Sequence, residues 1–255
     1  MSRPSFLLVE ILTFLVFIGL GFTVGSNIWD NNATQIETSL PKTIPEPLLS
    51  LPDGERILLL AGVDHVNTNQ PRLQSLWLLT YYLEDAPIQF LPIYPSGINP
   101  PTELERALIN TFSLVNDNGK TSLNPEFLGI LSHSNYWVSG YLVFDSYAYA
   151  QVINLIGGLP TDQGTFSGEQ ILDTIPLADE DPQAAHVQQI LSLGQACQTI
   201  SRMPSRPNWQ SIMHLIADKH IHTDLNPNGL LVELQQLTVE PSRVRCEFPS
   251  WSAVP

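Results

Sequence analysis

An apolar stretch at the N-terminus is the feature that most constrains this chain. The stretch runs from Phe6 to Val24 and is interrupted only by Glu10, Thr13 and Thr23. At ~1.5 Å per residue, about nineteen helical residues cover roughly 28 Å, close to the thickness of a bilayer core. The sequence therefore predicts a transmembrane helix over residues 6–24. Glu10 lies close enough to the start of this helix for its carboxylate to reach the membrane interface.

The charges that flank the stretch predict its orientation. Arg3 precedes it, whereas Asp30 and Glu37 follow it, and basic residues favour the cytoplasmic side of a membrane. Residues 1–5 are therefore expected in the cytoplasm and the C-terminal part of the chain outside it, anchored to the cell membrane by a single pass. A cleaved signal peptide is the alternative, but no A-x-A-like cleavage site follows the stretch, which favours the anchor.

Charge and cysteine content limit what the remainder can do. The chain has 25 acidic and 11 basic residues and a net charge of -14, which repels phosphate backbones and argues against a nucleic-acid partner. Cys197 and Cys246 lie far apart without C-x-x-C spacing, so a zinc site built on thiolates is not expected. We expect two unlinked, largely buried thiols, with a disulfide as the alternative outside the cytoplasm.

Residues 25–52 are rich in Asn, Thr, Ser and Pro, which is typical of an extended linker. The folded domain is predicted over residues 53–250. Continuous apolar runs, as in strands buried on both faces, predict four central strands at Arg56–Ala61, Leu76–Leu83, Pro87–Ile93 and Tyr136–Phe144, and a last strand is expected at Ser242–Phe248. Helical spacing and capping residues predict helices between them, at Glu103–Leu114, Asn124–Leu131, Asp145–Ile156, Gly168–Leu172, Pro182–Cys197, Asn208–His220 and Pro227–Leu237. Helices interleaved with buried strands indicate a layered α/β fold.

Eight short motifs occur in the order found in one known family. They are Ile57–Asp64, which ends in G-x-D, then Arg72–Leu76, Leu91–Ser96, Leu128–Ile130 followed by the aromatic strand at Tyr136, Asn154–Leu159, Gly168–Leu172, Asp181–Gln189 and Thr223–Leu234. Together they resemble the LytR-CpsA-Psr family from Arg56 to about Phe248. The resemblance implies an extracytoplasmic α/β/α sandwich with a mixed central sheet, preceded by one transmembrane helix.

The same resemblance implies a chemistry. Members of the family transfer anionic glycopolymers from a polyprenyl-pyrophosphate carrier to the cell wall. That reaction requires arginines to neutralise the pyrophosphate, and a divalent cation such as Mg²⁺ held by carboxylates. Asp64 and Arg72 match the family and are the candidate catalytic residues.

Other positions of the family pattern have lost their charges. Gln74 replaces a carboxylate and does not supply Mg²⁺ with a charged ligand, and Pro95 and Ser96 stand where an arginine and an aspartate belong. Ala184 and Val187 replace two further arginines, leaving Gln188 and Gln189 of that motif. The candidate ligand-binding residues are therefore Arg72, Gln74, Ser96, Gln188 and Gln189. No cofactor or metal site is expected, with Mg²⁺ implied only if an active site survives.

Three functions remain open at this point. The favoured one is a catalytically degenerate envelope module that binds or scaffolds a polyprenyl-linked glycan or cell-wall polymer. The second is an active glycopolymer transferase that uses rearranged polar residues. The third is an unrelated exported α/β domain. If the polyprenyl groove of the family persists, we expect it to be lined by Leu76, Leu78 and Ile93 on strands and by Val152, Leu155 and Ile156 on a helix. The same residues would also fill an ordinary closed core.

Overall fold

The computed structural model describes residues 55–68, 70–82, 87–117 and 120–249. The predicted cytoplasmic residues 1–5, the transmembrane helix at 6–24 and the linker at 25–52 lie outside the described residues, as does the predicted start of the domain at 53. Within the described part of the chain, no helix is long and apolar enough to cross a membrane.

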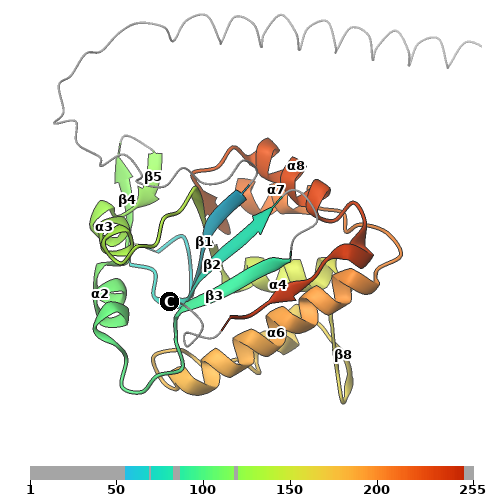
Figure 1. Ribbon diagram of the computed structural model, residues 1–255, viewed down its shortest axis with the longest axis horizontal. Coiled ribbons are helices and arrows are strands. Elements are labelled where there is room, and N and C mark those ends of the chain that lie inside the picture. The colour runs from blue at the N-terminus through green and yellow to red at the C-terminus, as the bar shows by residue number, and fades with distance from the viewer. Residues whose placement is uncertain (1–54, 69, 83–86, 118–119, 250–255) are drawn as a thin grey trace, which may run out of the picture. The chain divides into compact units, whose positions relative to one another are not determined.

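A mixed sheet of six strands forms the centre of the domain (Figure 1), in the order β10-β3-β2-β1-β6-β9. Its four inner strands are those predicted from apolar runs. They are β1 (Glu55–Val63), β2 (Leu73–Tyr82), β3 (Ile88–Tyr94) and β6 (Gly140–Asp145). β1 pairs antiparallel with β2 and parallel with β6. The α/β class and the mixed central sheet predicted from the sequence are confirmed.

Helices cover both faces of this sheet, because alternate strand residues point to opposite sides. On one face, Leu59, Leu76 and Val143 pack with α2 (Glu103–Thr111) and α3 (Pro125–His133) in one core cluster. On the other face, Leu142 and Phe144 pack in a second cluster with α4 (Ser146–Leu155), α5 (Gly168–Leu172), α7 (Gln210–Ala217) and α8 (Pro227–Leu237). Figure 1 shows α2 and α3 together on the left of the sheet, with the long α6 (Pro182–Arg202) running below it.

Side chains cap several helices where the sequence predicts their starts. Thr102 forms a capping box with Glu105 at the start of α2, Asp145 accepts a hydrogen bond from the Ala148 amide at the start of α4, and Asp181 caps α6. These oxygens satisfy amide groups that have no partner within the first helical turn. α6 continues to Arg202 rather than ending at Cys197 as predicted.

The short elements differ most from the prediction. Two hairpins were not predicted, β4–β5 (Leu114–Asp117 and Lys120–Leu123) and β7–β8 (Leu159–Thr161 and Gly164–Phe166). Neither was the edge strand β9 (Ile221–Thr223). The last predicted strand is mostly absent, since a 3-10 turn occupies Pro241–Arg243 and only Cys246–Glu247 forms β10.

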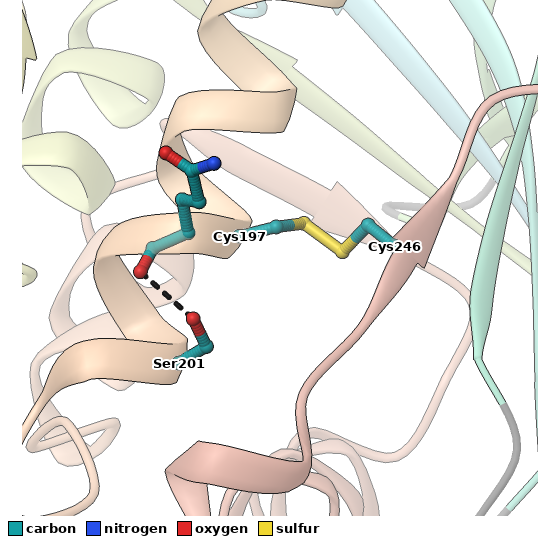
Figure 2. Close-up of a disulfide and its surroundings, with 4 residues drawn as sticks. Cys197, Ser201 and Cys246 are labelled. Carbon is teal, nitrogen blue, oxygen red and sulfur yellow. Dashed lines mark hydrogen bonds between the residues drawn. A yellow bond between two sulfur atoms is a disulfide. The ribbon is translucent and has the colours of Figure 1, made fainter.

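Cys197 and Cys246 form a disulfide that joins α6 to β10, as Figure 2 shows. Their Cα atoms are 6.2 Å apart, within the range that a disulfide spans. The expectation of two unlinked thiols is therefore wrong. The pairing depends on α6 running beside the edge strand, and cysteines separated by 49 residues carry no sequence signal for such an approach.

Candidate functional site

A cavity of about 300 Å³ opens between the sheet and helices α4 and α6. Its floor consists of residues from β1, β2 and β6, and its walls come from α4, α6 and the segment that follows α5. The apolar lining residues are Leu60, Val63, Trp77, Phe144, Tyr149, Leu172, Ile175, Pro176, Leu177 and Leu193. The lining includes Asp64 and the exposed His65, and we call the part of the cavity beside these two residues the mouth. A largely apolar cavity with a few polar groups is typical of a small-molecule site.

A β-bulge places two polar residues of β2 on the cavity wall. Val63 pairs with Leu73 and Gly62 pairs with Ser75, so Gln74 has no partner on β1. Such an extra residue breaks the alternation of side chains. As a result, the consecutive residues Gln74 and Ser75 both line the cavity. Gly62 makes room for this arrangement, because a Cβ atom there would lie 2.3 Å from the Ser75 Oγ atom.

Gln189 of α6 is held by hydrogen bonds to the sheet. Its Oε1 accepts a bond from Trp77 Nε1 at 3.2 Å, and its Nε2 donates to the carbonyl oxygen of Gln74 at 3.1 Å. On the same wall the Tyr149 hydroxyl donates to Ser192 Oγ at 2.7 Å, and Ser192 Oγ donates to the Gln189 carbonyl. Because these side chains hydrogen-bond to one another and to the backbone, they fix the cavity wall. They have little hydrogen-bonding capacity left for a ligand.

Gln74 and Ser75 differ from these satisfied groups. The Gln74 Oε1 atom accepts a bond from the Ala178 amide at 3.1 Å, which fixes the orientation of the side-chain amide because a backbone N–H can only donate. The Gln74 Nε2 atom is then a buried donor without a partner among the described residues. The Ser75 hydroxyl also has no hydrogen-bond partner within the same part of the chain.

Arg72 bridges two carboxylates at the mouth. Its Nε atom lies 3.3 Å from Asp64 Oδ2, and its Nη1 atom lies 3.5 Å from Asp179 Oδ2. The Arg72 side chain is 62% exposed, so these ion pairs are screened by water. Burial acts to raise the pKa of Asp64, but hydrogen bonds from the Arg72 and His65 amides and from the Arg72 guanidinium outweigh it and hold this pKa below its usual value. The mouth therefore pairs one guanidinium with two carboxylates.

The carboxylates at the mouth do not fit Mg²⁺. Asp64 Oδ1 already accepts the His65 and Arg72 amides at 2.8 Å each, and Oδ2 accepts Arg72 Nε. Gln74 stands where the family pattern has a second carboxylate, and its Oε1 accepts a hydrogen bond from the Ala178 amide. Among the described residues, no group of three His, Cys, Asp or Glu side chains is arranged to hold a metal ion.

The structure brings together only some of the predicted ligand-binding residues. Asp64, Arg72, Gln74 and Gln189 lie at or beside the cavity. Ser96 lies elsewhere, in a separate small cavity with His186, and its amide donates to the buried carboxylate of Glu105 at 2.8 Å.

Gln188 does not line the main cavity. It precedes Gln189 by one position on α6, which turns its side chain about 100° around the helix axis.

None of the six groove residues expected from the sequence lines the cavity, and they pack in the two cores instead, as the alternative of a closed core implies. Leu76, Leu78 and Ile93 belong to the core cluster on the opposite side of the sheet. Ile156 is a core residue of the second cluster, and Val152 and Leu155 pack against that cluster. Trp77, which follows Leu76 on β2, faces the cavity instead. The β2 segment is apolar at almost every position, so its sequence does not indicate which alternate set faces the helices.

The main wall residues missed by the sequence analysis are Ser75, Trp77 and Tyr149. Ser75 falls within the Arg72–Leu76 motif, directly after Gln74, so its proximity to Gln74 was visible in the sequence. Its orientation depends on the bulge at Gln74, which has no proline or glycine of its own to mark it.

The fold and cavity define an α/β domain with a helix-covered pocket on one face of a mixed sheet. Neither a family model nor a curated protein matches the sequence, but solved structures do. TagV from B. subtilis is 16% identical with a TM-score of 0.51, covering 78% of this chain and 85% of its own. Protein gbs0355 from Streptococcus agalactiae is 13% identical with a TM-score of 0.52, covering 77% and 76%.

TagT bound to LIIa-WTA is 12% identical with a TM-score of 0.50, covering 79% of this chain and 81% of its own. The LytR-CpsA-Psr-like fold predicted from the motifs is confirmed by these similarities.

Proposed function

We propose that the protein is a membrane-anchored, extracytoplasmic module of the cell envelope that binds the apolar part of a polyprenyl-type lipid or lipid-linked glycan and does not transfer the glycan. The observation that carries this proposal is the combination of a largely apolar cavity with a mouth at which Arg72 is shared by two carboxylates. Lipid binding requires the first feature, and pyrophosphate transfer requires free cations that the second does not supply.

Burial of apolar surface would drive binding in this cavity. Removing apolar area from water contributes roughly 25 cal/mol per Å². One structural neighbour with a similar fold, TagT, has been solved bound to LIIa-WTA, a wall teichoic acid precursor. That complex supports a ligand of related chemistry here.

The substituted residues support the proposal that the domain does not transfer the glycan. Ala184 and Val187, which replace two arginines of the family pattern, supply no charge to the mouth. Val187 is 47% exposed on α6, and Ala184 lies one turn before it. Gln74 is bound to the Ala178 amide, and Ser96 lies in another cavity. A diphosphate leaving group carries several negative charges, and Arg72 would have to compensate for them while paired with Asp64 and Asp179.

Two further observations support an extracytoplasmic location. The Cys197–Cys246 disulfide is the state expected in an oxidising compartment. The apolar residues 6–24 and the charges around them favour a single-pass anchor with the domain outside.

The test uses the full-length protein in lipid nanodiscs. We expect no Mg²⁺-dependent release or transfer of glycan from a polyprenyl-pyrophosphate-linked substrate above a protein-free blank, but we expect saturable binding of that lipid. Leu193→Trp, which fills the cavity, should abolish binding. Leu191→Trp is the matched control, because Leu191 lies on the same helix and is 51% exposed, and it should bind normally. Turnover that Arg72→Ala abolishes would mean that the domain is an active transferase.

A further inference from the structure

The two polar residues that the β2 bulge places on the cavity wall have hydrogen-bonding capacity that the described part of the protein does not use. Gln74 Nε2 is buried and has no partner there, and the Ser75 hydroxyl has none either. Buried donors are nearly always satisfied, and one left unpaired costs about 1–3 kcal/mol. The buried Gln74 donor, with the Ser75 hydroxyl beside it on the same cavity wall, points to a group other than the protein that completes the Gln74 amide.

The character of these groups specifies the ligand that would complete them. A side-chain amide N–H and a hydroxyl are neutral donors, suited to one or two uncharged acceptor oxygens. They lie on a wall that is otherwise apolar, so the rest of the ligand is apolar.

The charges at the mouth argue against an anionic head. Two carboxylates share the guanidinium of Arg72. Asp64 is ionised at neutral pH, as an ordinary aspartate is, and the direction of its pKa shift, downward, agrees with this. A third carboxylate, Asp145, also lines the cavity, and its Oδ2 lies 2.8 Å from His220 Nδ1. An incoming diphosphate would meet like charges at close range in a partly desolvated site, which disfavours its binding.

We propose that the preferred ligand is a neutral isoprenoid-like lipid that carries an alcohol or carbonyl oxygen, which accepts hydrogen bonds from Ser75 and Gln74. This inference rests on the proposed lipid-binding function and adds the chemistry of the head group. The domain then binds an uncharged lipid more tightly than the pyrophosphate-activated form.

Three probes with the same hydrocarbon chain test the proposal, namely farnesol, farnesyl diphosphate and the hydrocarbon farnesene. Binding to the full-length protein in nanodiscs is measured from the fluorescence of the cavity residue Trp77, with empty nanodiscs and a Trp77→Phe variant as blanks. Farnesol is expected to bind about tenfold or more tightly than farnesene, the size of one net hydrogen bond to a buried donor. It is also expected to bind more tightly than farnesyl diphosphate, because the carboxylates at the mouth repel the diphosphate.

Variants assign this preference to the bulge. Ser75→Ala combined with Gln74→Met removes both donors and should reduce the preference of farnesol over farnesene to within about twofold. Gln188→Met combined with Ser211→Ala is the matched control, because it makes the same two side-chain changes at residues that do not line the cavity. It should leave the preference unchanged.

Tighter binding of farnesyl diphosphate than of farnesol, or an unchanged preference in the double variant, would overturn the neutral-head proposal and leave the lipid-binding function standing. If none of the three probes binds, the lipid-binding function fails, and the neutral-head proposal fails with it.

Discussion

Gln188 and Gln189 are neighbours on α6, yet only the Gln189 side-chain amide forms hydrogen bonds with other described residues. Gln189 is 8% exposed and links Trp77 to the backbone of β2, whereas the Gln188 side chain has no hydrogen bond to a described residue. Gln189→Leu should therefore lower the free energy of unfolding by about 2–4 kcal/mol, since it leaves a buried donor and a buried acceptor unpaired. Gln188→Leu should change it by no more than about 0.5 kcal/mol.

Urea denaturation of the two variants measures this difference. Equal effects would mean that the Trp77–Gln189 contact contributes nothing to stability. The sequence alone made both glutamines equal candidates for ligand binding, because adjacent polar residues in a helix carry no mark of which one faces the sheet. The position of β2 relative to α6 decides between them.

Asp64 provides a pH-dependent contribution to stability. Its pKa is lower in the folded protein than the ordinary value of 3.8, so the stabilisation is complete above that value and is lost as the pH falls through the folded pKa. We expect the advantage of the wild type over Asp64→Asn, followed by thermal unfolding from about pH 6 to about pH 2.5, to stay constant above about pH 5 and to shrink below about pH 4. An advantage that grows on acidification would contradict the assigned pKa shift.

At the scale of elements, long segments could be predicted and short ones could not. The four inner strands were identified because a run such as Leu58–Ala61 is apolar on both faces, as a strand covered by two layers requires. The β4–β5 and β7–β8 hairpins have strands of three or four residues, too short to show a period of two. The cavity was misplaced for a related reason, since a strand that is apolar throughout does not reveal which face borders empty space.

The disulfide is expected to hold the last strand on the sheet. β10 pairs with β3 through only two residues, and the Cys197–Cys246 bond closes a segment of 49 residues. Replacing both cysteines by serine should lower the free energy of unfolding by about 4 kcal/mol, the chain-entropy value for a loop of this length. Hydrogen exchange at the Ile88 amide, which donates to the Arg245 carbonyl at 2.8 Å, should become faster.

A reducing agent serves as the control for this experiment. It should lower the melting temperature of the wild-type protein toward that of the Cys197→Ser/Cys246→Ser variant and leave the variant unchanged. Wild-type stability that does not respond to full reduction would show that packing alone holds β10 in place.

At the scale of the whole molecule, the fate of the N-terminus determines whether the protein works at a membrane or away from it. We expect residues 6–24 to remain attached, since no small-residue cleavage site follows them. N-terminal sequencing of the protein isolated from the membrane fraction should then give the intact start of the chain. A mature protein that begins near Gly25 or Ser26 would instead identify the stretch as a signal peptide.

The outermost strands of the sheet have a consequence for behaviour at high concentration. β9 has three residues and β10 has two, whereas the inner strands β1 and β2 have nine and ten. An exposed edge strand can pair with a strand of another molecule through its unpaired backbone N–H and C=O groups. A short edge strand presents few such groups. Many copies at high concentration would therefore have little opportunity to join edge to edge into fibrils, and the long apolar strands β1 and β2 stay in the middle of each sheet.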